Sequence, residues 1–302
     1  MKTYLLFALA ALPLMAQEKD PAPEPSLEEA RAKVLARINE HRKGAGLDPV
    51  TEDKELSRGC QLHAEYLVRN YNHASTIDGG EHEEQKTLPG YSDLGNKSAQ
   101  RSILWSWKDG FTPTSRIDGF MATLYHRIPL LSQTLSQIGI GLFRSVDGIQ
   151  SLVIDADSTD YRKTPKSEPI VYPSPNQENT PLSFALGHGE WPDPRPLRNI
   201  EAGFPITLIS DSRSWQLGEA IGYLQMADQE VPCWVSTPEK PALKDHPQPG
   251  VVCLIPKEKL KPNTKYTVTI KCKQYGIPNT PDWSKTWSFT TGADDKPSDK
   301  NK

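Results

Sequence analysis

The sequence lacks an apolar run long enough to cross a membrane, because its one candidate, residues 4–16, falls short of the roughly 20 residues that a spanning helix needs. It has only four cysteines in 302 residues, too few for a disulfide scaffold, and no Cys-x-x-Cys spacing typical of zinc or thioredoxin-like chemistry. It also lacks a positive excess, since 35 Lys and Arg stand against 38 Asp and Glu. This balance supplies no field for phosphate groups, so we expect no nucleic-acid partner.

The N-terminal segment has the composition of a secretory signal. Lys2 precedes the apolar stretch, Ala16 provides a small residue at its end, and polar residues follow at once. We therefore expect residues 1–16 to be a signal peptide and residues 17–26 to be a linker. The mature chain would carry no transmembrane anchor and would be secreted, periplasmic or associated with the cell envelope.

Apolar residues at helical spacing follow this linker. A capping-box pattern that starts at Ser26 predicts a helix over residues 27–43, and a second helix is predicted over residues 52–70. His63 and Cys60 share the apolar face of the second helix. We therefore expect a buried core histidine there, not a catalytic Cys–His pair.

A third helical pattern and a β-hairpin complete the first half of the chain. The helix is predicted over residues 117–124, and alternating apolar residues on both sides of an Asp-Gly turn predict the hairpin over residues 138–154. Trp105 and Trp107, two residues apart, would share one face of a strand, where they would either form the apolar floor of a cleft or, as we favour, fill the core. Together these elements predict an α+β domain over residues 27–162.

The second half of the chain has the pattern of an all-β domain. Residues 163–181 are rich in proline and almost without periodicity, which predicts an interdomain linker. Short strand-like runs over residues 182–292 then predict a β-sandwich. Residues 293–302 are small or charged, and we expect them to be disordered.

Three of the four cysteines lie in these strand-like runs. They are Cys233, Cys253 and Cys272, so at most one bridge can form among them. We favour a Cys233–Cys253 pair, although spacing alone leaves the connectivity open.

Ordered phrases in the first domain resemble the CAP superfamily, which joins cysteine-rich secretory proteins, antigen 5 and pathogenesis-related proteins. The resemblance lies in Ile38–Leu47, Leu56–Tyr66, Tyr125–Leu131 and Ile138–Gly141, in this order. It implies an α-β-α sandwich with a cleft. The second domain resembles a bacterial immunoglobulin-like module, which would act as a spacer or adhesion unit.

The CAP resemblance also implies candidate site residues. Many members place two histidines and two acidic residues in the cleft, where they can hold a divalent metal such as zinc. His126 and His73 resemble the two histidines and would be the metal ligands, and Glu81 resembles one acid. Thr123 stands where the other acid is expected, so the resemblance implies an incomplete set. A third or fourth ligand could come from Glu81, His82, Glu83 or Glu84, although a run of this composition is more typical of a solvated surface.

Two functions follow as alternatives. The first is a non-enzymatic binding module whose cleft takes a small molecule, a lipid or a cell-envelope component. The second is a metal-dependent hydrolase, a peptidase, in which His73, His126 and Glu81 would activate water. The missing acid at Thr123 favours binding over catalysis.

Overall fold

The computed structural model describes residues 26–108, 110–158, 168–184, 190–196, 200–211, 216–275 and 282–294. The predicted signal peptide, nearly all of the linker that follows it, and most of the predicted C-terminal tail lie outside these ranges. None of the described helices combines the length and apolar character needed to cross a membrane.

The N-terminal region is built on a four-stranded sheet with the order β1-β3-β4-β2. Strand β1 is parallel to β3, and the other neighbours are antiparallel. The predicted hairpin is confirmed as β3 and β4, and the two tryptophans lie in β2. The strand bounds are Thr51–Glu52 for β1, Ser102–Lys108 for β2, Gln137–Arg144 for β3 and Ile149–Asp155 for β4.

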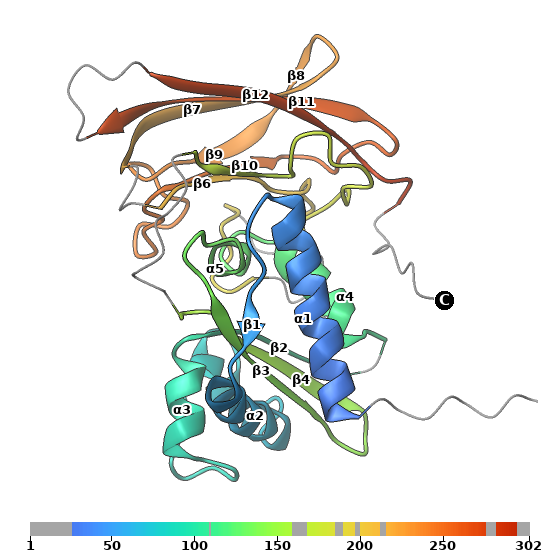
Figure 1. The fold of residues 1–302 in the computed structure, drawn as a ribbon, viewed down its shortest axis with the longest axis vertical. Coiled ribbons are helices and arrows are strands. Elements are labelled where there is room, and N and C mark those ends of the chain that lie inside the picture. The colour runs from blue at the N-terminus through green and yellow to red at the C-terminus, as the bar shows by residue number, and fades with distance from the viewer. Residues whose placement is uncertain are drawn as a thin grey trace, which may run out of the picture.

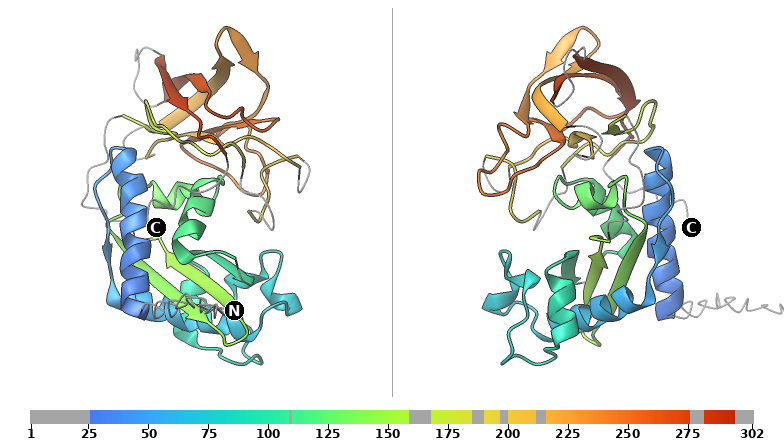
Figure 2. Two further views of the ribbon diagram at one scale, coloured as in Figure 1. Left: turned by 90° about the vertical axis from the view of Figure 1, so that its right-hand side faces the viewer. Right: turned by 60° about the vertical axis from the view of Figure 1, so that its left-hand side comes forward.

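Helices cover both faces of this sheet, as Figures 1 and 2 show. On one face, α2 packs on β3 and β4, and α3 packs on α2; on the other, α1 packs on β3 and α4. The predicted capping box at Ser26 is present at the start of α1. The helix bounds are Leu27–Gly44 for α1, Lys54–Arg69 for α2, Asp93–Ala99 for α3, Pro113–Met121 for α4 and Arg127–Leu130 for α5, with short 3-10 turns at Ala74–Thr76 and Gly80–His82.

Alternation along the strands divides the core between the two faces. Leu104 and Val153 face α2 and pack against its Cys60, whereas Ile103 and Ile154 belong to the cluster under α1 and α4. This confirms the layered α+β arrangement predicted for the first half of the chain.

Two glycines of β3 allow α2 to lie directly on the sheet. A Cβ atom at Gly141 would lie 2.1 Å from the carbonyl oxygen of Cys60, and one at Gly139 would lie 2.6 Å from the carbonyl carbon of Leu56. Any side chain at these positions would therefore push the helix away.

The C-terminal region consists of two antiparallel four-stranded sheets, ordered β5-β6-β10-β9 and β12-β11-β7-β8. Strand β7 of the second sheet contacts β9 and β10 of the first. In β11 the residues Tyr266, Val268 and Ile270 are buried and Lys271 is exposed, as the sequence alternation predicts. The bounds are Ile170–Tyr172 for β5, Ile206–Ile209 for β6, Gln216–Met226 for β7, Gln229–Val231 for β8, Cys233–Ser236 for β9, Val251–Pro256 for β10, Lys265–Tyr275 for β11 and Trp283–Thr290 for β12.

The prediction that residues 163–181 form only a linker is wrong. Within that range, β5 pairs with β6 and all three of its residues are buried. The prolines around Ile170–Tyr172 made this short apolar strand look like part of a loop. Burial of its three side chains stabilises the strand even though its neighbours have the composition of a loop.

The predicted Cys233–Cys253 bridge is also wrong, because all four cysteines are free thiols. The antiparallel register places Cys233 opposite Pro256 and Cys253 opposite Ser236, so the two cysteines are not cross-strand partners. Burial raises the pKa of each thiol to about 12, which keeps these cysteines protonated and unreactive at neutral pH.

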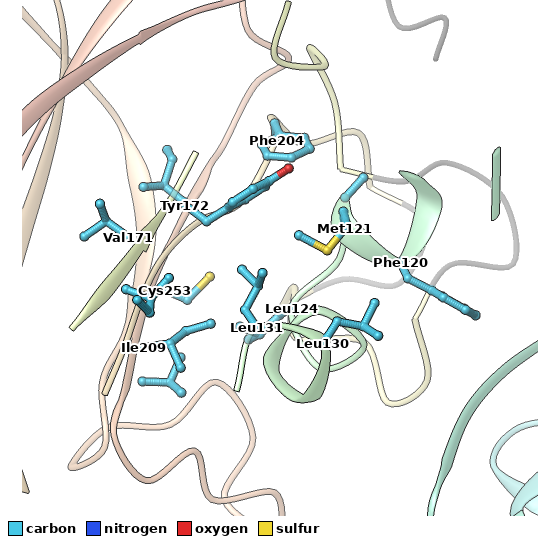
Figure 3. Close-up of a cluster of buried hydrophobic side chains, with 14 of the residues drawn as sticks. Phe120, Met121, Leu124, Leu130, Leu131, Val171, Tyr172, Phe204, Ile209 and Cys253 are labelled. Carbon is cyan, nitrogen blue, oxygen red and sulfur yellow. The ribbon is translucent and has the colours of Figure 1, made fainter. Parts of the chain in front are cut away.

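The two regions share one continuous apolar core. Figure 3 shows Met121 and Leu131, from the α4–α5 part of the chain, facing Tyr172, Phe204 and neighbouring side chains of the β-rich region. In Figures 1 and 2 the β-rich region lies against the α5 end of the N-terminal region, away from α2 and α3.

Arg127 is the polar group at the centre of this junction. It is fully buried and donates hydrogen bonds to the carbonyl of Met121, to the carbonyl of Pro205 at 2.6 Å and to the hydroxyl of Thr207 at 3.2 Å. Its guanidinium carbon lies 4.8 Å from the ring centroid of Tyr172. One side chain therefore joins the N-terminal region to β6.

Replacing Arg127 with methionine should lower the free energy of unfolding by about 3–5 kcal/mol, because buried acceptors in both regions lose their donor. Urea-induced unfolding measures this loss. Arg58→Met, on the exposed part of α2, is the matched control and should change stability by less than about 0.5 kcal/mol. Equal losses in the two variants would contradict the central role of Arg127.

Candidate functional site

His63 is a buried residue of α2 that fixes the neighbouring loop at residues 80–84. The side chain is 0% exposed on α2, its Nδ1 is 2.9 Å from Oε1 of Glu84, and its Nε2 is 2.8 Å from the carbonyl oxygen of Glu81. Because a carbonyl and a carboxylate only accept, Nε2 donates to Glu81 and Nδ1 donates to Glu84 in this arrangement. The predicted buried histidine is confirmed, and it ties α2 to the loop at residues 80–84.

Glu84 extends this network into the next segment. Its Oε2 accepts from the Ser92 backbone N–H at 2.8 Å, and its own N–H donates to Oδ1 of Asn96 at the same distance. The side chain is only 3% exposed, so the prediction of a solvated run over Glu81–Glu84 is wrong at this position. The carboxylate is buried because a histidine and a backbone N–H satisfy both of its oxygens.

His73 and Glu81 form local contacts in the same loop. The exposed His73 accepts a hydrogen bond from the Ser75 N–H at 3.2 Å and caps the first 3-10 turn. Glu81 Oε2 accepts from the Gly79 N–H at 2.8 Å. Among the described residues, no hydrogen bond, ion pair or ring contact joins either of them to His126, and the shared site of His73 and His126 stays a prediction.

His126 lies against aromatic residues at the start of α5. Its ring centroid is 4.8 Å from that of Phe120 and 6.4 Å from that of Trp105. Phe120 comes from α4 and Trp105 from β2, so a helix and a strand together position the imidazole. Trp107, on the same face of β2, is 4% exposed and fills the core, as expected.

An acid from the C-terminal region reaches His126. Glu190 accepts from the backbone N–H of Leu124 and from that of His126, each at 2.8 Å, and its Oε1 lies 3.3 Å from His126 Nδ1. The Glu190 side chain is 0% exposed. The site therefore has an acidic neighbour for this histidine, although Thr123 occupies the position expected for one.

The hydrogen bonds determine which nitrogen of His126 carries the proton. Thr123 is buried, and its hydroxyl donates to the carbonyl of Phe120 at 2.8 Å, so it accepts from His126 Nδ1 at 3.1 Å. Glu190 is also an acceptor on this side. The neutral imidazole thus holds its proton on Nδ1, and Nε2, without a hydrogen-bond partner among the described residues, has its lone pair free for a ligand.

The second imidazole of the site belongs to His82. Burial lowers the pKa of His82; its hydrogen bond to the Ala99 carbonyl opposes this shift, and the charges of His126 and His63 add to it. Nδ1 of His82 donates to that carbonyl at 3.1 Å, so its Nε2 is also unprotonated in the neutral form.

The described residues do not complete a metal site. No group of three or more His, Cys, Asp or Glu side chains in this part of the chain is arranged to hold a metal ion. His82 and His126 supply imidazole nitrogens of the kind that zinc prefers, and each has its second nitrogen occupied by an acceptor. Two ligands fall short of the three or four protein ligands of a zinc centre.

Sequence reasoning missed Glu190, and it considered His82 only as a possible third or fourth metal ligand within a solvated run. Glu190 follows a segment without periodicity, far from the phrases around His126, and no local pattern connects them. His82 belongs to a run of charged residues, and only its hydrogen bond to Ala99 shows that it turns inward.

Residues 35–153 match the cysteine-rich secretory protein family (CAP), so this part of the chain is a CAP domain. The matched range includes His63, His82 and His126 and ends before Glu190. Among solved structures, an outer surface protein from Borrelia burgdorferi is similar, with 20% identity and a TM-score of 0.30 over 43% of this chain and 92% of that chain. No curated protein matches the chain.

Substituting His63 by alanine should lower the free energy of unfolding by about 1–3 kcal/mol, through lost packing and lost hydrogen bonds. Glu84→Gln should cost less than Glu84→Ala, because the glutamine N–H can donate to His63 while its carbonyl accepts from Ser92. Urea unfolding tests both. His73→Ala is the exposed control. If it lowered the free energy of unfolding as much as His63→Ala, the stabilising role assigned to the buried His63 would be wrong.

Proposed function

We propose that this protein is exported and acts in the extracellular space or the cell envelope as a binding protein, with a small or lipidic ligand held at His126. Export is supported by the signal-like composition of residues 1–16 and by the secretory family to which the CAP domain belongs.

The observation that carries the binding role is the state of His126. Its side chain keeps 12% of its surface exposed, its Nδ1 is engaged by Thr123 and Glu190, and its Nε2 has no hydrogen-bond partner in the described chain. The neighbouring Trp105 is partly exposed and adds aromatic surface, whereas the fully buried Phe120 packs against the imidazole from inside. A single oriented acceptor beside an exposed aromatic ring suits a ligand that is mainly apolar and carries a polar group.

The C-terminal region is proposed to be an immunoglobulin-like module. Its two antiparallel four-stranded sheets and their shared core support this, as does the alternation in β11. The region would hold the CAP domain away from the cell surface. Because Glu190 belongs to the segment that precedes β6, it would also help to form the binding site.

A hydrolase is the second candidate, and the contact between Glu190 and His126 favours it. A carboxylate beside Nδ1 orients an imidazole so that Nε2 can accept a proton from water or another nucleophile. A metal-dependent peptidase using His73, His126 and Glu81 would need a third ligand, which the described residues do not supply.

Binding at His126 should be detectable with Nile red, an uncharged apolar probe whose fluorescence rises in apolar surroundings. His126→Ala should weaken its binding about fivefold, because one aromatic stacking contact is worth about 1 kcal/mol. Tyr223→Ala removes an exposed aromatic ring on β7, and as the control it should leave Nile red binding unchanged. Unaltered Nile red binding in His126→Ala would contradict the proposal, and cleavage of a peptide library that His126→Ala abolishes would support the hydrolase instead.

Export predicts a shortened mature chain. Mass spectrometry of the protein recovered from the periplasm or the medium of an expressing bacterium should show an N-terminus at Gln17, after removal of residues 1–16. An intact Met1 on the exported protein would contradict a cleaved signal peptide.

A further inference from the structure

Arg116, on α4, is a buried cation without an anionic partner among the described residues. The residue is 7% exposed, and its guanidinium has no hydrogen bond or ion pair with any described residue. Its Nε is fully buried and without a partner. Burial lowers the pKa of Arg116 to about 10, so the group remains charged at neutral pH.

The other buried arginines of the protein show how unusual this is. Arg42 donates to four backbone carbonyls, among them that of Leu130 at 2.7 Å, and Arg127 donates to the carbonyls and hydroxyl at the junction of the two regions. Buried charged groups are ordinarily satisfied in this way, because an unpaired one costs free energy. Arg116 is the exception within the described part of the chain.

Aromatic rings surround Arg116 instead. Its guanidinium carbon lies 3.8 Å from the ring centroid of Phe111, 4.6 Å from that of Trp105 and 4.9 Å from that of Trp107. Aromatic rings attract the cation but supply no carbonyl or carboxylate oxygen for its N–H donors. The two Nη groups therefore have no acceptor among the described residues, and the Nε is buried away from solvent.

We propose that Arg116 binds the carboxylate of an organic ligand whose apolar part packs on Phe111 and Trp105. The planar fork of a guanidinium matches the two oxygens of a carboxylate. Phe111 is 53% exposed, so an apolar surface lies open beside the cation. Both features together favour an organic acid over an inorganic anion.

Trp105 connects this site to the one proposed above. The same indole contacts Arg116 and His126, so a ligand lying along it would meet a cation at Arg116 and a hydrogen-bond acceptor at His126. The inference therefore rests on the proposed function and specifies its ligand class as amphipathic carboxylic acids.

Calorimetric titration of the full mature chain with 3-phenylpropionate and with the uncharged 3-phenylpropanol tests this proposal. The acid should bind at least about tenfold more tightly than the alcohol, because only the acid forms charge-assisted hydrogen bonds. Arg116→Gln should weaken binding of the acid to the level of the alcohol. Arg58→Gln, an exposed arginine on the opposite face of the sheet, removes the same charge and should change nothing.

Several outcomes would overturn the proposal. They are equal binding of acid and alcohol, unchanged acid binding in Arg116→Gln, or competition by inorganic phosphate as strong as that by the acid. If Arg116→Gln does not fold, Arg116→Lys retains the charge without the fork and should still weaken acid binding. Nile red separates this inference from the proposed function, because its binding should persist in Arg116→Gln. Loss of acid binding in Arg116→Gln with Nile red binding retained would support the carboxylate site. A wild-type protein that binds Nile red but not the acid would overturn this inference and leave the proposed function standing.

Discussion

A buried guanidinium joins the two halves of this protein. Arg127 is charged and fully buried, which is tolerated only because carbonyls from both regions, at Met121 and Pro205, accept its hydrogen bonds and because aromatic rings cover it. Neither region alone provides all of these acceptors. The packing of α4 and α5 against β6 therefore depends on this side chain, and so does the position of His126, the preceding residue.

The same junction makes the β-rich region part of the site. Glu190 crosses to the CAP domain, satisfies the backbone N–H groups of Leu124 and His126, and lies beside the imidazole. The family resemblance implies an acid at position 123, where this chain has threonine. Glu190, from the other region, places a carboxylate beside His126 instead. The carboxylate beside the His126 imidazole thus comes from outside residues 35–153, so the proposed binding role would depend on both regions.

Much of the fold could be predicted from local patterns. Helical spacing and the capping box at Ser26 identified the helices, and alternation identified the hairpin and β11. The CAP resemblance was confirmed for residues 35–153, and the burial of His63 followed from its place on an apolar helix face. Local spacing determines these features, because side chains return to the same face every 3.6 residues in a helix and every two residues in a strand.

Only the tertiary structure decided which residues each helix or strand face contacts. Local spacing carried no information on the register that separates Cys233 from Cys253, on the inward turn of His82, or on the reach of Glu190 to His126. It also could not show that Arg116 lacks an anionic partner among the described residues while Arg127 donates to backbone carbonyls. The sequence by itself determined the elements and their buried faces. Contacts between residues far apart in the chain decided the partners, because they arise only when separate elements pack together.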